Sequence, residues 1–307
     1  MTRTSANLLM LVAGLVWGLG FVAQEQAMDD IGPFLFMGLR FALAALALAP
    51  LVLWELRKRD DALPHLSNKD WLSLVTVGVI FFTAMALQQV GLLATSVTNA
   101  GVLTGLYVVL TPIILHLFFG QRQPVIIGAC AATAFLGIWL LGGGGLGRLT
   151  WGDWVMIVGA VFAALHVIIV GATVGKMRLP ATLAAMQFAI ASLFSWAGFA
   201  VVRIADWSYE PALAFNIVAR AAPEIAYAAL IAGALAFTIM AFCQQYTKAA
   251  DAAILLSSEA LFAALGGAIL LGERLDVLGY AGCAILFGAI VVTSFASAKL
   301  EERATLT

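Results

Sequence analysis

The chain has 307 residues and a formal net charge of −1; 63% of its residues are hydrophobic and only 11% are charged. Its mean hydropathy is +1.02. Soluble domains carry about 25% charged residues, so this composition excludes a soluble globule and indicates an integral membrane protein. No Lys/Arg cluster interleaved with aromatic residues is present, which excludes nucleic-acid binding. The three cysteines share no metal-ligand or disulfide spacing, so we expect no metal and no other cofactor.

Ten apolar segments follow one another along the chain. A hydrocarbon core of roughly 30 Å requires about 20 apolar residues per helix, and each segment is close to that length. In the first half they cover 7–27, 34–54, 71–92, 98–119 and 125–141; in the second half they cover 151–175, 181–202, 225–246, 252–271 and 277–296. The sequence therefore predicts an all-α membrane protein with ten transmembrane helices.

The two halves of the chain repeat one another at an offset of about 150 residues. Each half has a Gly-polar-Arg turn followed by an apolar helix with a Gly-x8-Gly pattern, at Gly120-Gln121-Arg122 and at Gly272-Glu273-Arg274. Pro33 and Pro180 each precede a span, and each is followed seven residues later by a polar residue and Phe (Arg40-Phe41 and Gln187-Phe188). Asn99 and Asp251 also occupy matching places.

An odd number of spans per copy forces the second copy to enter the bilayer upside down. We therefore predict two inverted five-helix repeats, residues 1–147 and 148–307, joined at the glycine-rich stretch 142–147. Inverted repeats of this kind are typical of secondary transporters, which place the substrate site where the halves meet.

Lys and Arg residues are distributed unevenly between the two sides of the predicted bundle. The side of the termini has eleven: Arg3, Arg57, Lys58, Arg59, Lys69, Arg122, Lys176, Arg178, Lys248, Lys299 and Arg303. The other side has four: Arg148, Arg203, Arg220 and Arg274. Positive charge accumulates in cytoplasmic loops, so we predict an inner-membrane protein with both termini in the cytoplasm.

Three motifs follow one another along the chain: GLVWGLGF at 14–21, TNAGVLTGLYVVLTPIILHLFFGQR at 98–122 and SSEALFAALGGAILLGERLDVLGYAG at 257–282. Together they resemble the EamA-like family of the drug/metabolite transporter superfamily, and among its subgroups the YddG-type exporters of aromatic and other neutral amino acids. The resemblance implies a ten-helix carrier whose central cavity is lined mainly by the first, third, fourth, sixth, eighth and ninth spans. Many relatives have Pro after the acid of the ninth span. Here Ala260 follows Glu259, so the sequence does not decide whether the helix is kinked at this point.

A polar side chain inside the bilayer is costly, so each one is a candidate site residue. Glu259 is the only carboxylate well inside a predicted span. It could bind a substrate ammonium group or exchange a proton, or it could be held by Ser257, Ser258 or a helix end. His166 could titrate near neutral pH or simply be hydrogen-bonded in the bundle. Arg40 could attract a substrate carboxylate, but pairing with a neighbouring helix or snorkelling outward is the favoured interpretation.

Aromatic residues on five spans are expected to face the cavity, where their rings would suit a planar or amphipathic substrate. Ordinary packing is the alternative for each of them. The predicted substrate-binding set is Trp17, Phe82, Asn99, Tyr107, Phe162, His166, Phe237, Ser257 and Glu259.

The sequence has no H-E-x-x-H zinc motif and no Walker loop, which argues against an enzyme or an ATP-driven pump. We predict a secondary transporter that exports small amphipathic metabolites, neutral and aromatic amino acids first among them, by alternating access. Its expected partners are a small-molecule substrate and the lipid bilayer, and the sequence is compatible with a monomer. A proton-coupled multidrug exporter, with Glu259 and His166 as coupling groups, is the alternative. A non-transporting membrane sensor or partner subunit is the alternative of another class.

Overall fold

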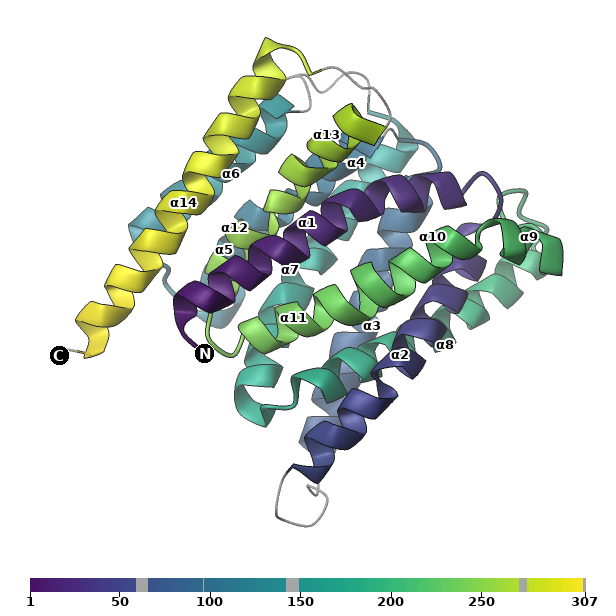
Figure 1. The fold of residues 1–307 in the computed structure, drawn as a ribbon, viewed down its shortest axis with the longest axis horizontal. Coiled ribbons are helices and arrows are strands. Elements are labelled where there is room, and N and C mark those ends of the chain that lie inside the picture. Colours follow the sequence, from purple (N-terminus) through teal and green to yellow (C-terminus); the bar gives the residue numbers. More distant parts are fainter. Residues whose placement is uncertain (59–65, 96, 142–148, 271–274, 306–307) are drawn as a thin grey trace.

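The computed structural model describes residues 1–58, 66–95, 97–141, 149–270 and 275–305, and every regular element in these ranges is a helix (Figure 1). The first half contains α1 (Arg3–Ala27), α2 (Pro33–Arg57), α3 (Asn68–Gly91), α4 (Val97–Thr104), α5 (Tyr107–Phe119) and α6 (Val125–Leu141). The second half contains α7 (Trp151–Met177), α8 (Pro180–Ile204), α9 (Phe215–Arg220), α10 (Ala222–Ala226), η1 (Tyr227–Leu235), α11 (Ala236–Cys243), α12 (Ala249–Leu256), α13 (Ser258–Leu270) and α14 (Val277–Thr305).

These helices form the ten predicted spans. Within the described ranges, nine spans have the length and hydropathy needed to cross a membrane, and α6 is a shorter apolar helix of 17 residues. The tenth helix continues beyond the predicted end at residue 296 to Thr305. The predicted joint at 142–147, and with it the boundary between the repeats, lies outside the described residues.

Three spans consist of more than one helix. The fourth span is interrupted at Gly105 and Leu106, between α4 and α5. The ninth is interrupted at Ser257, between α12 and α13, although no proline follows Glu259. The Ser257 hydroxyl donates a hydrogen bond to the Ile254 carbonyl oxygen at 2.7 Å, a contact that competes with the helical ladder and bends helices. The ninth span is therefore broken without the proline that many relatives have there.

The eighth span contains the third irregularity, the π-helical segment η1. Wide turns of this kind are rare and occur often at functional sites. Two side-chain hydrogen bonds join this segment to α1. Trp17 Nε1 donates to the Ala232 carbonyl oxygen at 2.8 Å, and the Tyr227 hydroxyl donates to the Val16 carbonyl oxygen at 2.8 Å.

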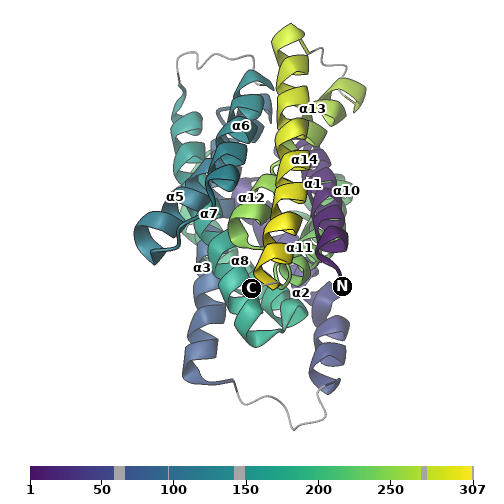
Figure 2. The same cartoon turned by 90° about the vertical axis from the view of Figure 1, so that its left-hand side faces the viewer.

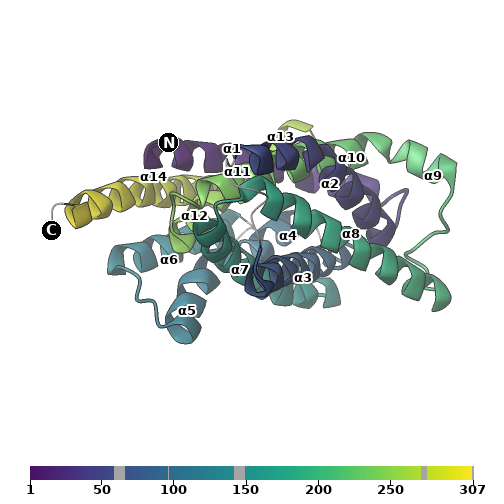
Figure 3. The same cartoon turned by 90° about the horizontal axis from the view of Figure 1, so that it is seen from below.

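The contacts between helices follow the symmetry of the repeat. If each span is replaced by its counterpart in the other half, which lies five spans away, the same contacts are found. The most extensive contacts join α2 to α8 and α6 to α14, and α2 and α8 lie side by side in Figures 1 and 3. The contact of α3 with α7 has its counterpart in the contact of α1 with η1 and α11. Both termini lie at the same end of the bundle (Figures 1 and 2). The predicted fold, ten transmembrane helices in two inverted repeats, is confirmed.

The pair α2 and α8 is also joined by two reciprocal carboxylate caps. The two backbone N–H groups that follow Pro180 donate to the Glu55 carboxylate, near the end of α2, at 3.0 and 2.8 Å. The two that follow Pro33 donate to the Glu210 carboxylate, in the segment after α8, both at 2.9 Å. The first N–H groups of a helix have no partner within the helix and carry partial positive charge, so each carboxylate stabilises the start of the other repeat's helix.

Candidate functional site

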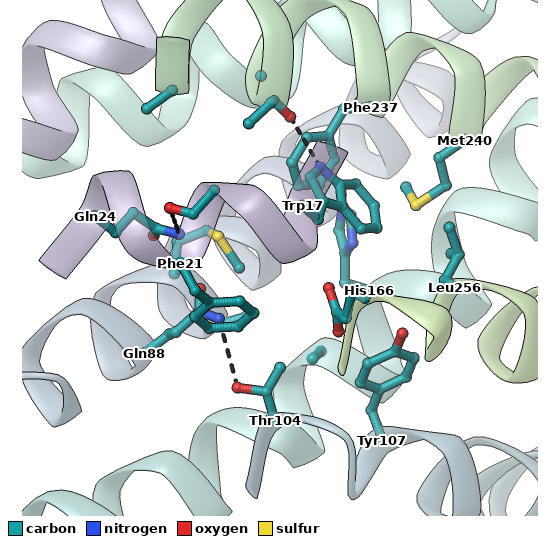
Figure 4. Close-up of a pocket in the computed structure, with 18 of the residues that line it drawn as sticks. Trp17, Phe21, Gln24, Gln88, Thr104, Tyr107, His166, Phe237, Met240 and Leu256 are labelled. Atoms are coloured by element: carbon teal, nitrogen blue, oxygen red, sulfur yellow. Dashed lines mark hydrogen bonds between the residues drawn. The ribbon is translucent and has the colours of Figure 1, made fainter. Parts of the chain in front are cut away.

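A cavity of about 90 Å³ lies between the two halves of the bundle (Figure 4). It is large enough for several water molecules, each of which needs at least about 10–15 Å³. Its lining comes from the first, second, third, fourth, sixth, eighth and ninth spans. The six spans expected to line it do so, and the second span, which was not expected, contributes Arg40 and Phe41.

The predicted site residues divide into three groups. Five of them line the cavity: Trp17, Tyr107, His166, Phe237 and Glu259. Three lie elsewhere: Phe82 stacks on Phe194 with ring centroids 5.4 Å apart, Phe162 is half-buried on α7 away from the cavity lining, and Ser257 is buried with its hydroxyl bonded to Ile254. The side chain of Asn99 lies outside the described residues.

Tyr107 and Glu259 lie where the fourth and ninth spans are interrupted. Tyr107 is the first residue of α5 and Glu259 the second of α13, so each follows a break in its span. Tyr107 is eight residues after Asn99 and Glu259 eight residues after Asp251, which makes them equivalent in the two repeats. Both are buried, with 4% and 6% of their surface exposed. The repeat thus brings one phenol and one carboxylate from corresponding positions to the same cavity.

The Tyr107 hydroxyl lies beside the Glu259 carboxylate, but it has no hydrogen bond of ordinary geometry within the described part of the chain. The two serines suggested as partners of Glu259 do not hold it. The Ser257 hydroxyl donates to a backbone carbonyl instead, and the buried Ser258 hydroxyl has no hydrogen-bond partner among the described residues. Glu259 lies in the first turn of α13, where a helix end favours negative charge.

His166 is held in one orientation by the second repeat. Its Nε2 shares a hydrogen bond of 2.9 Å with Oε1 of Gln187, the residue that corresponds to Arg40 in the other half. With the Gln187 amide in this orientation its oxygen accepts, which is the bond that a proton on Nε2 makes. The imidazole also packs against Phe81, with ring centroids 5.2 Å apart.

An aromatic cluster forms one wall of the cavity. The rings of Trp17 and Phe237 lie 4.5 Å apart, and Phe237 packs edge to face on Phe81 at 5.0 Å. Figure 4 shows Trp17 and Phe237 ring against ring, with the Tyr107 hydroxyl directed toward the middle of the pocket. Phe81 is fully buried behind this wall and supports it, whereas its neighbour Phe82 lies away from the cavity.

Arg40 was not among the predicted site residues, but it lines the cavity. The favoured pairing with a neighbouring helix is present, because the side chain bonds Gln24 of α1. Arg40 does not snorkel outward, since only 5% of its surface is exposed, and it forms no ion pair with an acid of the described chain. Its Nη1 donates to Gln24 Oε1 at 2.9 Å, and its guanidinium lies 4.9 and 4.6 Å from the ring centroids of Phe36 and Phe41. The sequence feature that could have identified Arg40 is its match with Gln187 in the other repeat, a residue that is also buried at the interface of the halves.

Several further lining residues were not singled out as substrate contacts. They are Phe21, Gln24, Met85, Gln88, Thr104, Met240 and Leu256. Gln88 Nε2 and Thr104 Oγ1 lie 3.4 Å apart and connect the third and fourth spans beside the cavity (Figure 4).

A bundle of two inverted repeats, with interrupted helices meeting at a cavity between them, is the architecture of a membrane transporter. The sequence matches the EamA-like transporter family over residues 4–143 and 150–295, nearly the whole chain, so the protein belongs to this family. It is a multi-pass membrane transporter of small metabolites.

Similarity to individual proteins agrees with the family. An uncharacterized transporter of Archaeoglobus fulgidus is 28% identical over 95% of this chain and 86% of its own length, and a second from the same organism is 24% identical over 95% and 98%. A crystal structure with 17% sequence identity superposes on 98% of this chain and 100% of its own with a TM-score of 0.76. At that identity the superposition shows the fold alone.

Proposed function

We propose that the protein exports neutral and aromatic amino acids. The observation that carries this proposal is the combination, in one cavity, of the aromatic wall of Trp17 and Phe237 with the buried carboxylate of Glu259. The carboxylate complements a substrate ammonium group, and the rings offer a large apolar contact area and attract cations. The resemblance to YddG-type exporters supports the same substrate class.

Alternating access is part of the proposal. Both halves contribute to the cavity in equivalent ways, through the interrupted fourth and ninth spans. Secondary transporters with inverted repeats rock one unit against the other around a fixed site, and helix interruptions supply ligand groups there. Export, rather than uptake, rests on the family resemblance, and cytoplasmic termini rest on the distribution of Lys and Arg.

A proton-coupled multidrug exporter is the second candidate. The observation that favours it is that Glu259 faces the cavity beside an uncharged phenol, with no basic side chain hydrogen-bonded to it within the described residues. Such a carboxylate could bind a drug cation and a proton in turn, because either one neutralises its buried charge.

Flux into liposomes that contain the purified protein separates the candidates. We expect a screen of neutral and aromatic amino acids and of cationic drugs, with and without a pH gradient, to show amino-acid flux without a gradient. Flux of drugs alone, and only with a gradient, would favour the second candidate. Absence of any flux would reject both and leave a sensor or partner subunit.

A further inference from the structure

Arg40 has two hydrogen-bond donors that nothing in the described chain satisfies. Its Nη1 is bonded to Gln24, but Nε and Nη2 are buried without a partner in the described residues. Arg40 is one of the cavity-lining residues, and 5% of its surface is exposed. A buried charged donor without a partner is costly, so a group that completes this site would be bound favourably.

The contacts that Arg40 does make leave those donors available. The rings of Phe36 and Phe41 stabilise the positive charge through their faces. These rings contact the guanidinium without accepting hydrogen bonds from the N–H groups along its edge. Arg40 is the eighth residue of α2, roughly 10 Å along the helix axis from its start, so the side chain lies well inside the span.

We infer that Arg40 forms a subsite for a carboxylate group in the central cavity. The free pair, Nε and Nη2, presents two parallel N–H bonds on one edge of the guanidinium, the arrangement that receives both oxygens of a carboxylate. This inference rests on the proposed transport of amino acids and refines it. Arg40 receives the substrate carboxylate, Glu259 receives its ammonium group, and the aromatic wall receives its side chain.

Gln24 is the positioning residue of this subsite. Its Oε1 accepts from Arg40 Nη1, and its Nε2 donates to the Gly20 carbonyl oxygen at 3.2 Å, so α1 fixes the orientation of the guanidinium. In the other repeat, Gln187 occupies the position of Arg40 and bonds His166. Because this counterpart is neutral, the pair of equivalent positions provides one anion subsite and imposes one orientation on a zwitterionic substrate.

The test compares two ligands that differ only in the carboxylate, L-tryptophan and L-tryptophan amide. Binding to the purified full-length protein is measured by thermal stabilisation, and flux is measured in liposomes. Loss of hydrogen bonds to a charged group predicts that Arg40→Gln weakens L-tryptophan binding by roughly 10- to 100-fold. Binding of the amide should be the same in the variant and the wild type. Arg57→Gln, at the exposed end of the same helix, is the matched control and should change neither ligand.

A second variant keeps the arginine and tests the same contact. Gln24→Glu places a carboxylate on Nη1 of the guanidinium, where it neutralises the positive charge that attracts the substrate carboxylate, so it should reproduce the selective loss for L-tryptophan. It also decides the question if Arg40→Gln fails to elute as a single folded species. Equal losses for both ligands, or unchanged L-tryptophan binding, would overturn the subsite. A wild-type protein that moves no amino acid would instead reject the proposed function.

Discussion

At the scale of residues, two pairs of equivalent positions in and beside the cavity differ in chemistry. Tyr107 and Glu259 occupy the same place in the two repeats, one neutral and one acidic. Arg40 and Gln187 form a second such pair, one cationic and one neutral. Duplication supplies the symmetric frame, and these differences between equivalent positions break its symmetry, as the proposed binding of an oriented zwitterion would require.

Replacement of Glu259 by Gln tests its role directly. If Glu259 binds a substrate ammonium group, the variant should lose roughly 10- to 100-fold in amino-acid affinity at every pH, because it loses a charge-assisted hydrogen bond. Flux in liposomes at several pH values, with and without a gradient, measures this. Loss of the gradient response alone would mean proton coupling, and wild-type behaviour in full would leave Glu259 as a structural group. Glu25→Gln, on the exposed face of α1, is the control.

Replacement of Trp17 by Ala removes a ring from the aromatic wall. Ring packing contributes about 0.5–1.5 kcal/mol beyond buried area, so we expect flux of aromatic substrates to fall by roughly two- to tenfold or more. The variant also loses the hydrogen bond to the π-helical segment. Trp71→Ala, which removes a ring that is 47% exposed at the start of α3, should leave flux unchanged. Equal flux in the wild type and Trp17→Ala would assign Trp17 to packing.

There is a physical reason why some cavity residues could be predicted from the sequence and others could not. Trp17, Tyr107, Phe237 and Glu259 were predicted because each is a large or charged side chain on a span expected to face the cavity. Phe82 was chosen on α3, but Phe81 is the one behind the aromatic wall. Consecutive helical residues point about 100° apart, so a sequence without an observed interface cannot tell which neighbour faces inward.

At the scale of elements, the Glu210 cap gives the start of α2 a testable dependence on pH. Burial raises the pKa of the Glu210 carboxyl above its ordinary value of 4.5, although the backbone N–H groups of Leu35 and Phe34 and the charge of Arg203 oppose the rise. The folded state therefore retains the proton to a higher pH than the unfolded state. The stability linked to this proton is fully present below the ordinary pKa and is lost as pH rises through the raised one.

Glu210→Gln should remove that dependence, because an amide does not ionise. We expect the difference in melting temperature, wild type minus variant, to decrease as pH rises from about 4.5 through the raised pKa of Glu210. Above that range the ionised carboxylate accepts from both N–H groups, whereas the amide has one acceptor oxygen for the two, which should cost the variant about 1 kcal/mol there. Thermal unfolding in detergent measures both effects, with Glu224→Gln on α10 as the control. Parallel curves for the two proteins would mean that Glu210 titrates normally.

The spans themselves could be predicted from the sequence, but their irregularities could not. Ten apolar segments of membrane length identify ten helices because lipid leaves a helix little alternative. The break at Ser257 depends on the rotamer of one side chain, whose hydroxyl bonds the Ile254 carbonyl oxygen. The π-helical turns of η1 depend on which carbonyls neighbouring helices satisfy, as the bond from Trp17 to Ala232 illustrates. Such bonds join residues far apart in the sequence, so a periodic pattern carries no trace of them.

At the scale of the whole molecule, the inverted repeat links architecture to orientation. The second copy lies upside down relative to the first, so residues at equivalent turns of the two repeats belong on opposite sides of the membrane. The structure places Lys176 and Asp70 at one end of the bundle, where Lys176 Nζ donates to the Asp70 carboxylate at 2.8 Å. The Glu210 cap, next to Tyr209, lies at the other end, at the start of α2.

Reporter fusions along the chain should resolve these two sides. We expect Lys58 and Lys176 to report the cytoplasm, because Lys and Arg accumulate on their side, while Tyr209 reports the outside. Gly144, between the repeats, should also report the outside, since five spans separate it from a cytoplasmic N-terminus. A report from Gly144 on the same side as Lys58 would contradict the odd number of spans in the first repeat. A report of all four positions inverted would keep the architecture and reverse the orientation, and with it the side to which the carrier delivers its substrate.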